Sequence, residues 1–236
     1  MCRVSSPNVR RVDGLAALLE AELRRAMEKQ EQIHGTTVKF EAARQNASGF
    51  TRVEVARIRA LKVEQLQLAG FMDEIRRKLM EEEAEVYRYV VESVIEEMTD
   101  SALGLGRDET GDSTQNVQME AIRKLKDLIE AFKARRKEAE AGKWIVCPAP
   151  PQGEPPRPPL VPDLVQLELI KKQQEALRLK TQVLGRRLDP GADDVSPAER
   201  AFLRRLSDEQ GRLHGILGRL IEKFNRQIHD SSEDER

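Results

Sequence analysis

Apolar residues recur every three or four positions along most of this chain. That spacing places side chains on one face of an α-helix, whereas a half-buried strand requires alternation. The longest example is the segment from Thr51 to Leu103, which has 53 residues, no proline and a single glycine, Gly70. Read as one helix it would be about 80 Å long, which favours a coiled coil or an extended bundle. Its repeating apolar positions are Ile58, Leu61, Leu68, Met72, Ile75, Leu79, Val86 and Val90.

The same spacing predicts a helix before this segment and another after it. The first covers residues 13–45, with Asp13 as a plausible N-cap, and it places the polar residues Gln30 and Thr37 at core positions. Polar residues there weaken an apolar seam but can fix its register. The later helix covers residues 114–141 and follows a turn with three glycines, Gly104, Gly106 and Gly111. Gly104 suits the left-handed position after a helix, and Ser113 or Thr114 can cap the next one.

The segment 143–162 is the clearest boundary, because it holds eight of the eleven prolines. Such a spacer is extended and cannot join a helix. Two further helices, at 163–188 and 197–229, are predicted to form a hairpin. Ser196, Pro197 and Glu199 match a capping box that opens the second of them.

We therefore predict an all-α, elongated long-helix bundle or coiled coil with a C-terminal helical hairpin after a proline-rich linker. The expected domains are a long-helix region at 1–142, the linker at 143–162, the hairpin at 163–229 and an acidic disordered tail at 230–236. An 80 Å stripe exceeds what shorter neighbours in the same chain can cover, so a homo-oligomer or a helical protein partner is also expected.

Composition narrows the possible functions. Forty basic residues nearly cancel forty-one acidic ones, and the net charge is −1, so nucleic acid is not an expected partner. No apolar run approaches the roughly 20 residues needed to cross a bilayer. Cys2 and Cys147 are the only cysteines, which excludes a disulfide framework and a cysteine-only zinc site.

No signal peptide is recognisable at the N-terminus. The default compartment is cytoplasmic, with the periplasm or cell envelope as the alternative if the true start lies upstream.

Several motifs resemble functional sites, but each has a structural interpretation that we favour. None of the histidines lies three or four residues from another, so all three are interpreted as surface residues. The glycine turn lacks the Lys-Ser/Thr pair of a phosphate-binding loop. The basic run from Lys133 to Lys137 is diluted by glutamates and is interpreted as a solvated helix end. The acidic run from Glu81 to Glu85 has no Glu-x-x-His partner, so an acidic helix face is predicted. The histidines are His34, His214 and His229.

Two stretches carry a family resemblance. VYRYVVESVIEEMTDSALGLGRDETGDSTQNVQMEAIRKLKDLIEAF and, after the proline-rich gap, PPLVPDLVQLELIKKQQEALRLKTQVL resemble a group of uncharacterised helical proteins of planctomycete-type bacteria. The matching features are Glu-Glu-Met before the turn, Thr114-Gln115 at the next helix, the ending from Asp127 to Phe132, and Leu-x-x-Leu-x-Leu-Ile-Lys at the hairpin. The resemblance implies no activity. Members of the group often resemble exported or envelope-associated proteins with a signal sequence, and this chain departs from them because none is recognisable.

The predicted function is that of a structural or scaffolding protein that acts through helix–helix contacts, with a cell-envelope assembly as one setting. The alternative is a regulatory adaptor whose proline-rich linker recruits a partner domain. We do not expect the protein to be an enzyme, because no nucleophile–base or metal constellation is present in the sequence. No catalytic, cofactor-binding or metal-binding residue is predicted, and no cofactor or small-molecule substrate is expected.

Overall fold

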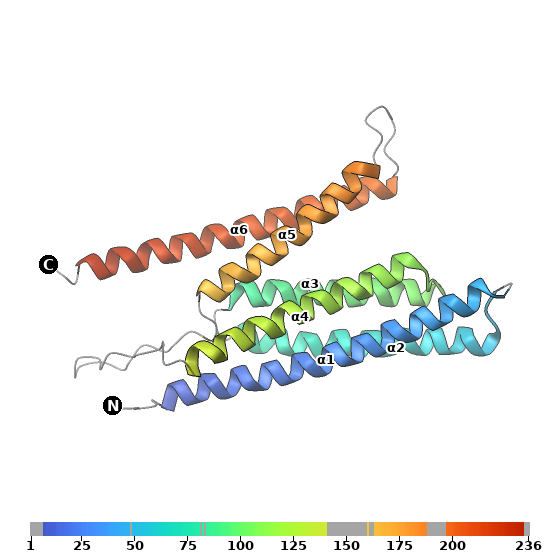
Figure 1. Ribbon diagram of the computed structural model, residues 1–236, viewed down its shortest axis with the longest axis horizontal. Helices are drawn as coiled ribbons and strands as arrows, with labels where there is room; N and C mark the ends of the chain where they lie inside the picture. Colours follow the sequence, from blue (N-terminus) through green and yellow to red (C-terminus); the bar gives the residue numbers. More distant parts are fainter. Residues whose placement is uncertain are drawn as a thin grey trace. The chain divides into compact units, whose positions relative to one another are not determined.

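The computed structural model describes residues 7–47, 49–80, 82, 84–140, 160, 163–187 and 197–233. Within these residues it contains six α-helices and no strand, which confirms the predicted all-α class. The chain divides into two compact units, residues 1–162 and 163–236. Figure 1 shows the helices coloured along the sequence.

The first unit is a bundle of four helices in which consecutive helices run in opposite directions (Figure 1). Each helix packs against two others, and α1 closes the ring against α4. Two ion pairs show that α1 and α2 are antiparallel. Lys29 pairs with Glu64, whereas Lys78 near the end of α2 pairs with Glu22 nearer the start of α1. The four helices are α1 (Pro7–Gln45), α2 (Arg52–Met80), α3 (Glu85–Gly106) and α4 (Asp112–Glu140).

The predicted single helix from Thr51 to Leu103 is wrong, because the chain reverses between Met80 and Glu85. The reversal costs a few helical hydrogen bonds of about 1 kcal/mol each. It lets the apolar stripe of α2 pack against α3, and each large apolar side chain that becomes buried contributes roughly 1.5–3 kcal/mol. Eight residues of α2 and twelve of α3 are buried, so burial outweighs the broken helix. The apolar stripe of α2 is therefore covered within the bundle and is not exposed for a partner.

The core of the first unit is apolar along most of its length. Tyr87 and Phe132 are its largest fully buried side chains, and their rings meet edge to face with centroids 4.9 Å apart. Such a pair contributes about 0.5–1.5 kcal/mol beyond its buried area. The predicted core positions of Gln30 and Thr37 are confirmed, since both side chains are 0% exposed.

Several predicted helix starts are displaced. Helix α1 begins at Pro7 rather than near Asp13; proline fits the first turn of a helix, where its missing N–H removes no bond. Asp13 therefore lies inside the helix and pairs with Arg135 at 3.0 Å.

At the start of α2 the sequence analysis missed a capping box. The Thr51 N–H donates to the Glu54 carboxylate at 2.8 Å, and the Glu54 N–H donates to the Thr51 hydroxyl at 3.3 Å.

Gly104 has a different role from the predicted one. Helix α3 continues to Gly106, so Gly104 lies within the helix and not after it. A Cβ built on Gly104 would lie 2.5 Å from Oγ1 of Thr114, whose hydroxyl donates to the Glu109 carbonyl at 2.8 Å. The left-handed residue of the turn is Asp108, with φ of 59°. Glycine at position 104 therefore permits the close approach of α3 and α4.

We expect Gly104→Ala to lower the free energy of unfolding by about 1–2 kcal/mol. The new methyl group displaces Thr114, and overpacking of this kind costs about 1–3 kcal/mol. The better helix propensity of alanine offsets part of this cost. Urea unfolding followed by circular dichroism measures the change. Gly70→Ala is the matched control, because its Cβ meets nothing within 4 Å, and it should stabilise the chain slightly. Equal effects of the two substitutions would contradict the role of Gly104 in the close approach of α3 and α4.

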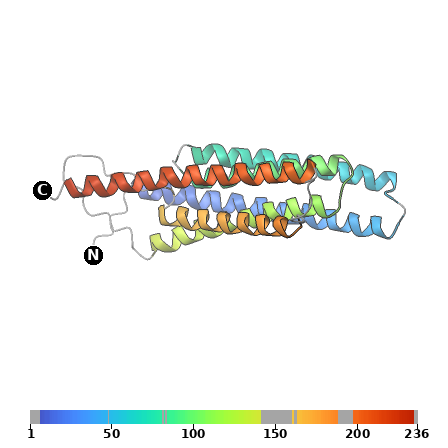
Figure 2. The ribbon, with the colours of Figure 1, turned by 90° about the horizontal axis from the view of Figure 1, so that it is seen from above.

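The second unit consists of α5 (Asp163–Arg187) and α6 (Pro197–Glu233), which pack against each other. The Lys223 ammonium group lies 3.5 Å from the carboxylate of Asp163 at the start of α5. Helix α6 continues to Glu233, so the first residues of the predicted disordered tail are helical; no proline or glycine interrupts them. Most of the proline-rich segment and the Ser196 cap lie outside the described residues, so those two predictions stay untested. Figure 2 shows the same helices after a quarter turn.

Candidate functional site

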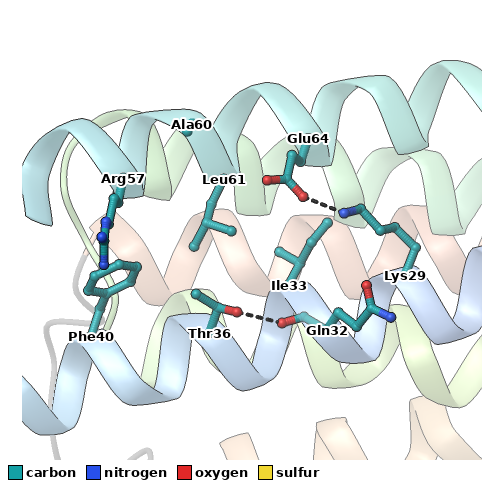
Figure 3. A pocket seen from close by; sticks show the side chains of 9 residues that line it. All are labelled: Lys29, Gln32, Ile33, Thr36, Phe40, Arg57, Ala60, Leu61 and Glu64. Atoms are coloured by element: carbon teal, nitrogen blue, oxygen red, sulfur yellow. Dashed lines mark hydrogen bonds and ion pairs between the residues drawn. The ribbon is translucent and has the colours of Figure 1, made fainter.

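A groove opens between α1 and α2 of the first unit, with a volume of about 340 Å³. In Figure 3, Ile33 of α1 and Leu61 of α2 point toward one another across it. Both are almost completely buried and supply an apolar floor. Thr36 and Ala60 are small side chains on the same seam, and larger residues there would fill the space. The lining residues are Lys29, Gln32, Ile33, Thr36, Phe40, Arg57, Ala60, Leu61 and Glu64.

The two ends of the groove differ in charge. At one end Lys29 and Glu64 form an ion pair of 2.5 Å, so their charges cancel. At the other end Arg57 points toward the ring of Phe40 (Figure 3). Among the described residues Arg57 has no carboxylate within ion-pair distance, although it lowers the pKa of Glu54 after the larger effect of hydrogen bonds from Thr51. The Phe40 end of the groove therefore carries a guanidinium that forms no ion pair within the described residues, although the charge of Glu54 acts on it.

A chain of buried polar side chains crosses the interior beside this groove. The amide groups of Gln30 and Gln65 donate to each other at 3.2 and 2.6 Å, and the Ser101 hydroxyl donates to Gln65 at 3.4 Å. These contacts join α1, α2 and α3 at one level. Because a buried amide without a partner costs about 1–3 kcal/mol, this pairing disfavours helix registers that separate the two glutamines.

His34 was predicted to lie at the surface, but it contacts a second group of buried polar side chains. Its Nδ1 lies 3.2 Å from Oε1 of Gln118, whose amide group donates to the Thr37 hydroxyl at 3.1 Å. The Thr37 hydroxyl in turn donates to the Ile33 carbonyl. Because Oε1 of Gln118 can only accept, this contact is a hydrogen bond in the tautomer that carries hydrogen on Nδ1. His34 therefore acts as a link between α1 and α4. His214 is exposed, as predicted, and the side chain of His229 lies outside the described part.

Glu41 ties the end of α1 to the turn between α3 and α4. Its carboxylate accepts from Arg44 at 2.7 and 3.0 Å and from the Thr110 hydroxyl at 2.8 Å. The hydrogen bond from Arg44, and next the one from Thr110, lowers the pKa of Glu41 to about 2. The side chain is buried, so this charge holds the turn in place.

The basic run from Lys133 to Lys137 was predicted to be a solvated helix end, and this holds for Arg136 and Lys137 but not for Arg135. Arg135 is buried and pairs with Asp13, while Arg136 pairs with Glu20 at 3.2 Å. Both acidic partners lie on α1, so the run fastens the last turns of α4 to that helix. Arg135 is thus paired inside the bundle, whereas Arg136 is 55% exposed at its side chain and pairs with Glu20 from the outside.

The other motifs form no site within the described residues. The acidic run was predicted to lie on a helix face, but Glu82 lies in a turn and Glu85 is the first residue of α3. No cluster of three metal-ligating side chains occurs among the residues that the structure describes. None of the helices is long and apolar enough, over its described residues, to span a membrane.

The second unit exposes large apolar side chains on both of its helices. The exposed fractions are 60% for Leu164, 56% for Leu179 and 50% for Val183 on α5. On α6 they are 41% for Phe202 and 48% for Ile221. Phe202 is much more exposed than Leu206 and Leu213, which are buried on the same helix. Two helices share only one seam, which leaves these positions on the outside of the pair.

Comparisons with known proteins give no match: no family model, curated protein or solved structure resembles the chain significantly.

Proposed function

We propose that this protein is a scaffold that assembles through helix–helix contacts, and that the α5–α6 pair is its assembly module. The observation that supports the proposal is the exposed apolar surface of the second unit, at Leu164, Leu179, Val183, Phe202 and Ile221. Leu179 and Val183 are one turn apart on the same face of α5, and adjacent exposed apolar groups are typical of interaction surfaces.

The first unit provides the comparison within the same chain. There each helix has two helical neighbours that bury its apolar stripe, although single apolar residues such as Val53 and Met119 are exposed. Within the second unit each helix has one such neighbour. A pair of helices has a small core, which mini-proteins of this kind commonly supplement by oligomerisation. A second copy of the chain would supply two more helices, so that the two pairs together form a four-helix arrangement like that of the first unit.

We expect the full chain to sediment as a dimer at micromolar concentration. The double substitution Leu179→Lys and Val183→Lys should shift the equilibrium toward monomer, because two charges would be placed in the interface. Sedimentation equilibrium measures the association constant, and circular dichroism checks that the helices remain.

Val63→Lys is the matched control, since Val63 is 52% exposed on α2 of the first unit. It should leave association unchanged. A monomeric wild-type chain at high concentration would overturn the proposal. So would a dimer that the double substitution and the control affect equally, because the interface would then lie elsewhere.

A further inference from the structure

We infer that the groove between α1 and α2 binds a single-chain amphiphile with an anionic head group, such as a fatty acid. This inference concerns the first unit and is independent of the assembly proposed for α5 and α6. It departs from the sequence-based expectation that the chain has no small-molecule ligand.

The shape of the groove favours an elongated ligand. Its lining on α1 extends from Lys29 to Phe40, about 16 Å at 1.5 Å per residue. Its volume of about 340 Å³ lies at the lower end of ordinary ligand pockets, which run from about 300 to 1,000 Å³. A lining that extends along the helix axis suits a hydrocarbon chain better than a compact polar metabolite.

The chemistry of the lining supports the same ligand class. Ile33 and Leu61 form the floor, and Phe40 adds an aromatic ring at one end (Figure 3). Contact of a hydrocarbon chain with these groups removes apolar surface from water on both sides. The polar lining groups Gln32 and Thr36 come from α1, and the Thr36 hydroxyl already donates to the Gln32 carbonyl.

The charges give the ligand an orientation. Arg57 at the Phe40 end lacks a carboxylate within ion-pair distance among the described residues, whereas Lys29 at the opposite end is neutralised by Glu64. A carboxylate head bound by the Arg57 guanidinium makes charge-assisted hydrogen bonds. The chain of the ligand then extends over Ile33 and Leu61 toward the Lys29–Glu64 pair, where no net charge opposes it.

Titration calorimetry of the full chain with dodecanoate, below its critical micelle concentration, tests the inference. We expect one site per chain, with dodecan-1-ol binding at least tenfold more weakly because it has no charge for Arg57. Arg57→Gln should weaken dodecanoate about tenfold and leave dodecan-1-ol unchanged. Ala60→Leu should weaken both ligands about tenfold, because the larger side chain fills the groove.

Two controls lie on the same helix outside the groove. Arg52→Gln and Ala56→Leu match the two test substitutions in chemistry, and both should bind dodecanoate as the wild type does. Absence of binding would overturn the inference, and so would equal affinity for acid and alcohol. If Ala60→Leu reduced self-association and dodecanoate did not bind, the groove would be a contact between copies, and the inference would also fail. Dimerisation through Leu179 and Val183 has no bearing on these outcomes.

Discussion

Replacement of Lys124 by methionine is expected to lower the free energy of unfolding by about 3 kcal/mol. Lys124 is only 4% exposed, and its ammonium group donates to the Ser93 hydroxyl and to the Glu97 carboxylate, the latter at 2.6 Å. Removing one member of a buried ion pair leaves the other charge without compensation, which costs about 3–5 kcal/mol. Arg123 also interacts with the Glu97 charge, so the lower end of that range applies.

A double-mutant cycle separates this loss from simple packing changes. The combined substitution Lys124→Met and Glu97→Met removes both charges and should recover most of the stability, because an apolar pair replaces a buried ionic one. Lys126→Met is the matched control: Lys126 lies two positions away, is 54% exposed at its side chain and pairs with Glu31 at 3.1 Å. An exposed pair of this kind contributes about 0–1 kcal/mol. Equal losses at Lys124 and Lys126 in urea unfolding would contradict the prediction.

The sequence predicted the helical class and most helix positions, since apolar spacing is a local property. Gln30 and Thr37 were placed correctly in the core for the same reason. The reversal between α2 and α3 was missed because no proline or glycine lies between Met80 and Glu85. It follows instead from burial of the α2 stripe against α3, and that gain depends on a contact between distant residues. Local propensity contains no information about it.

The candidate groove could not be predicted for a related reason. It exists because Thr36 and Ala60 come from separate helices and leave a seam incompletely filled. Neither residue is unusual in its own helix, and their proximity depends on the antiparallel register of α1 and α2. The roles of Arg135 and Arg136 were likewise hidden, because their partners on α1 lie more than 100 positions earlier in the chain. The Thr51 capping box, by contrast, was visible as Thr-x-x-Glu and was overlooked.

Stability should fall steeply in acid because of Glu41. Its pKa is lowered from 4.5 to about 2 in the folded chain, so the unfolded chain takes up a proton at this position first as the pH falls. The stabilisation is therefore complete above pH 4.5 and is lost progressively as the pH approaches 2. The slope in that window is at most about 1.4 kcal/mol per pH unit. Arg44 is half exposed at its side chain, and solvent screening reduces the expected total to about 2 kcal/mol.

Glu41→Gln tests this prediction, because the amide keeps an oxygen that accepts from Thr110 but carries no charge and does not titrate. The variant should be less stable than the wild type at neutral pH, and the difference should become small as the pH nears 2, since about half of the wild-type carboxylate is then protonated. Urea midpoints measured between pH 6 and pH 2 give both curves. Glu31→Gln is the control for loss of a carboxylate near the surface, as Glu31 is 45% exposed at its side chain. Parallel curves for the wild type and Glu41→Gln would show that the turn between α3 and α4 is held by the hydrogen bond from Thr110 and not by the charge.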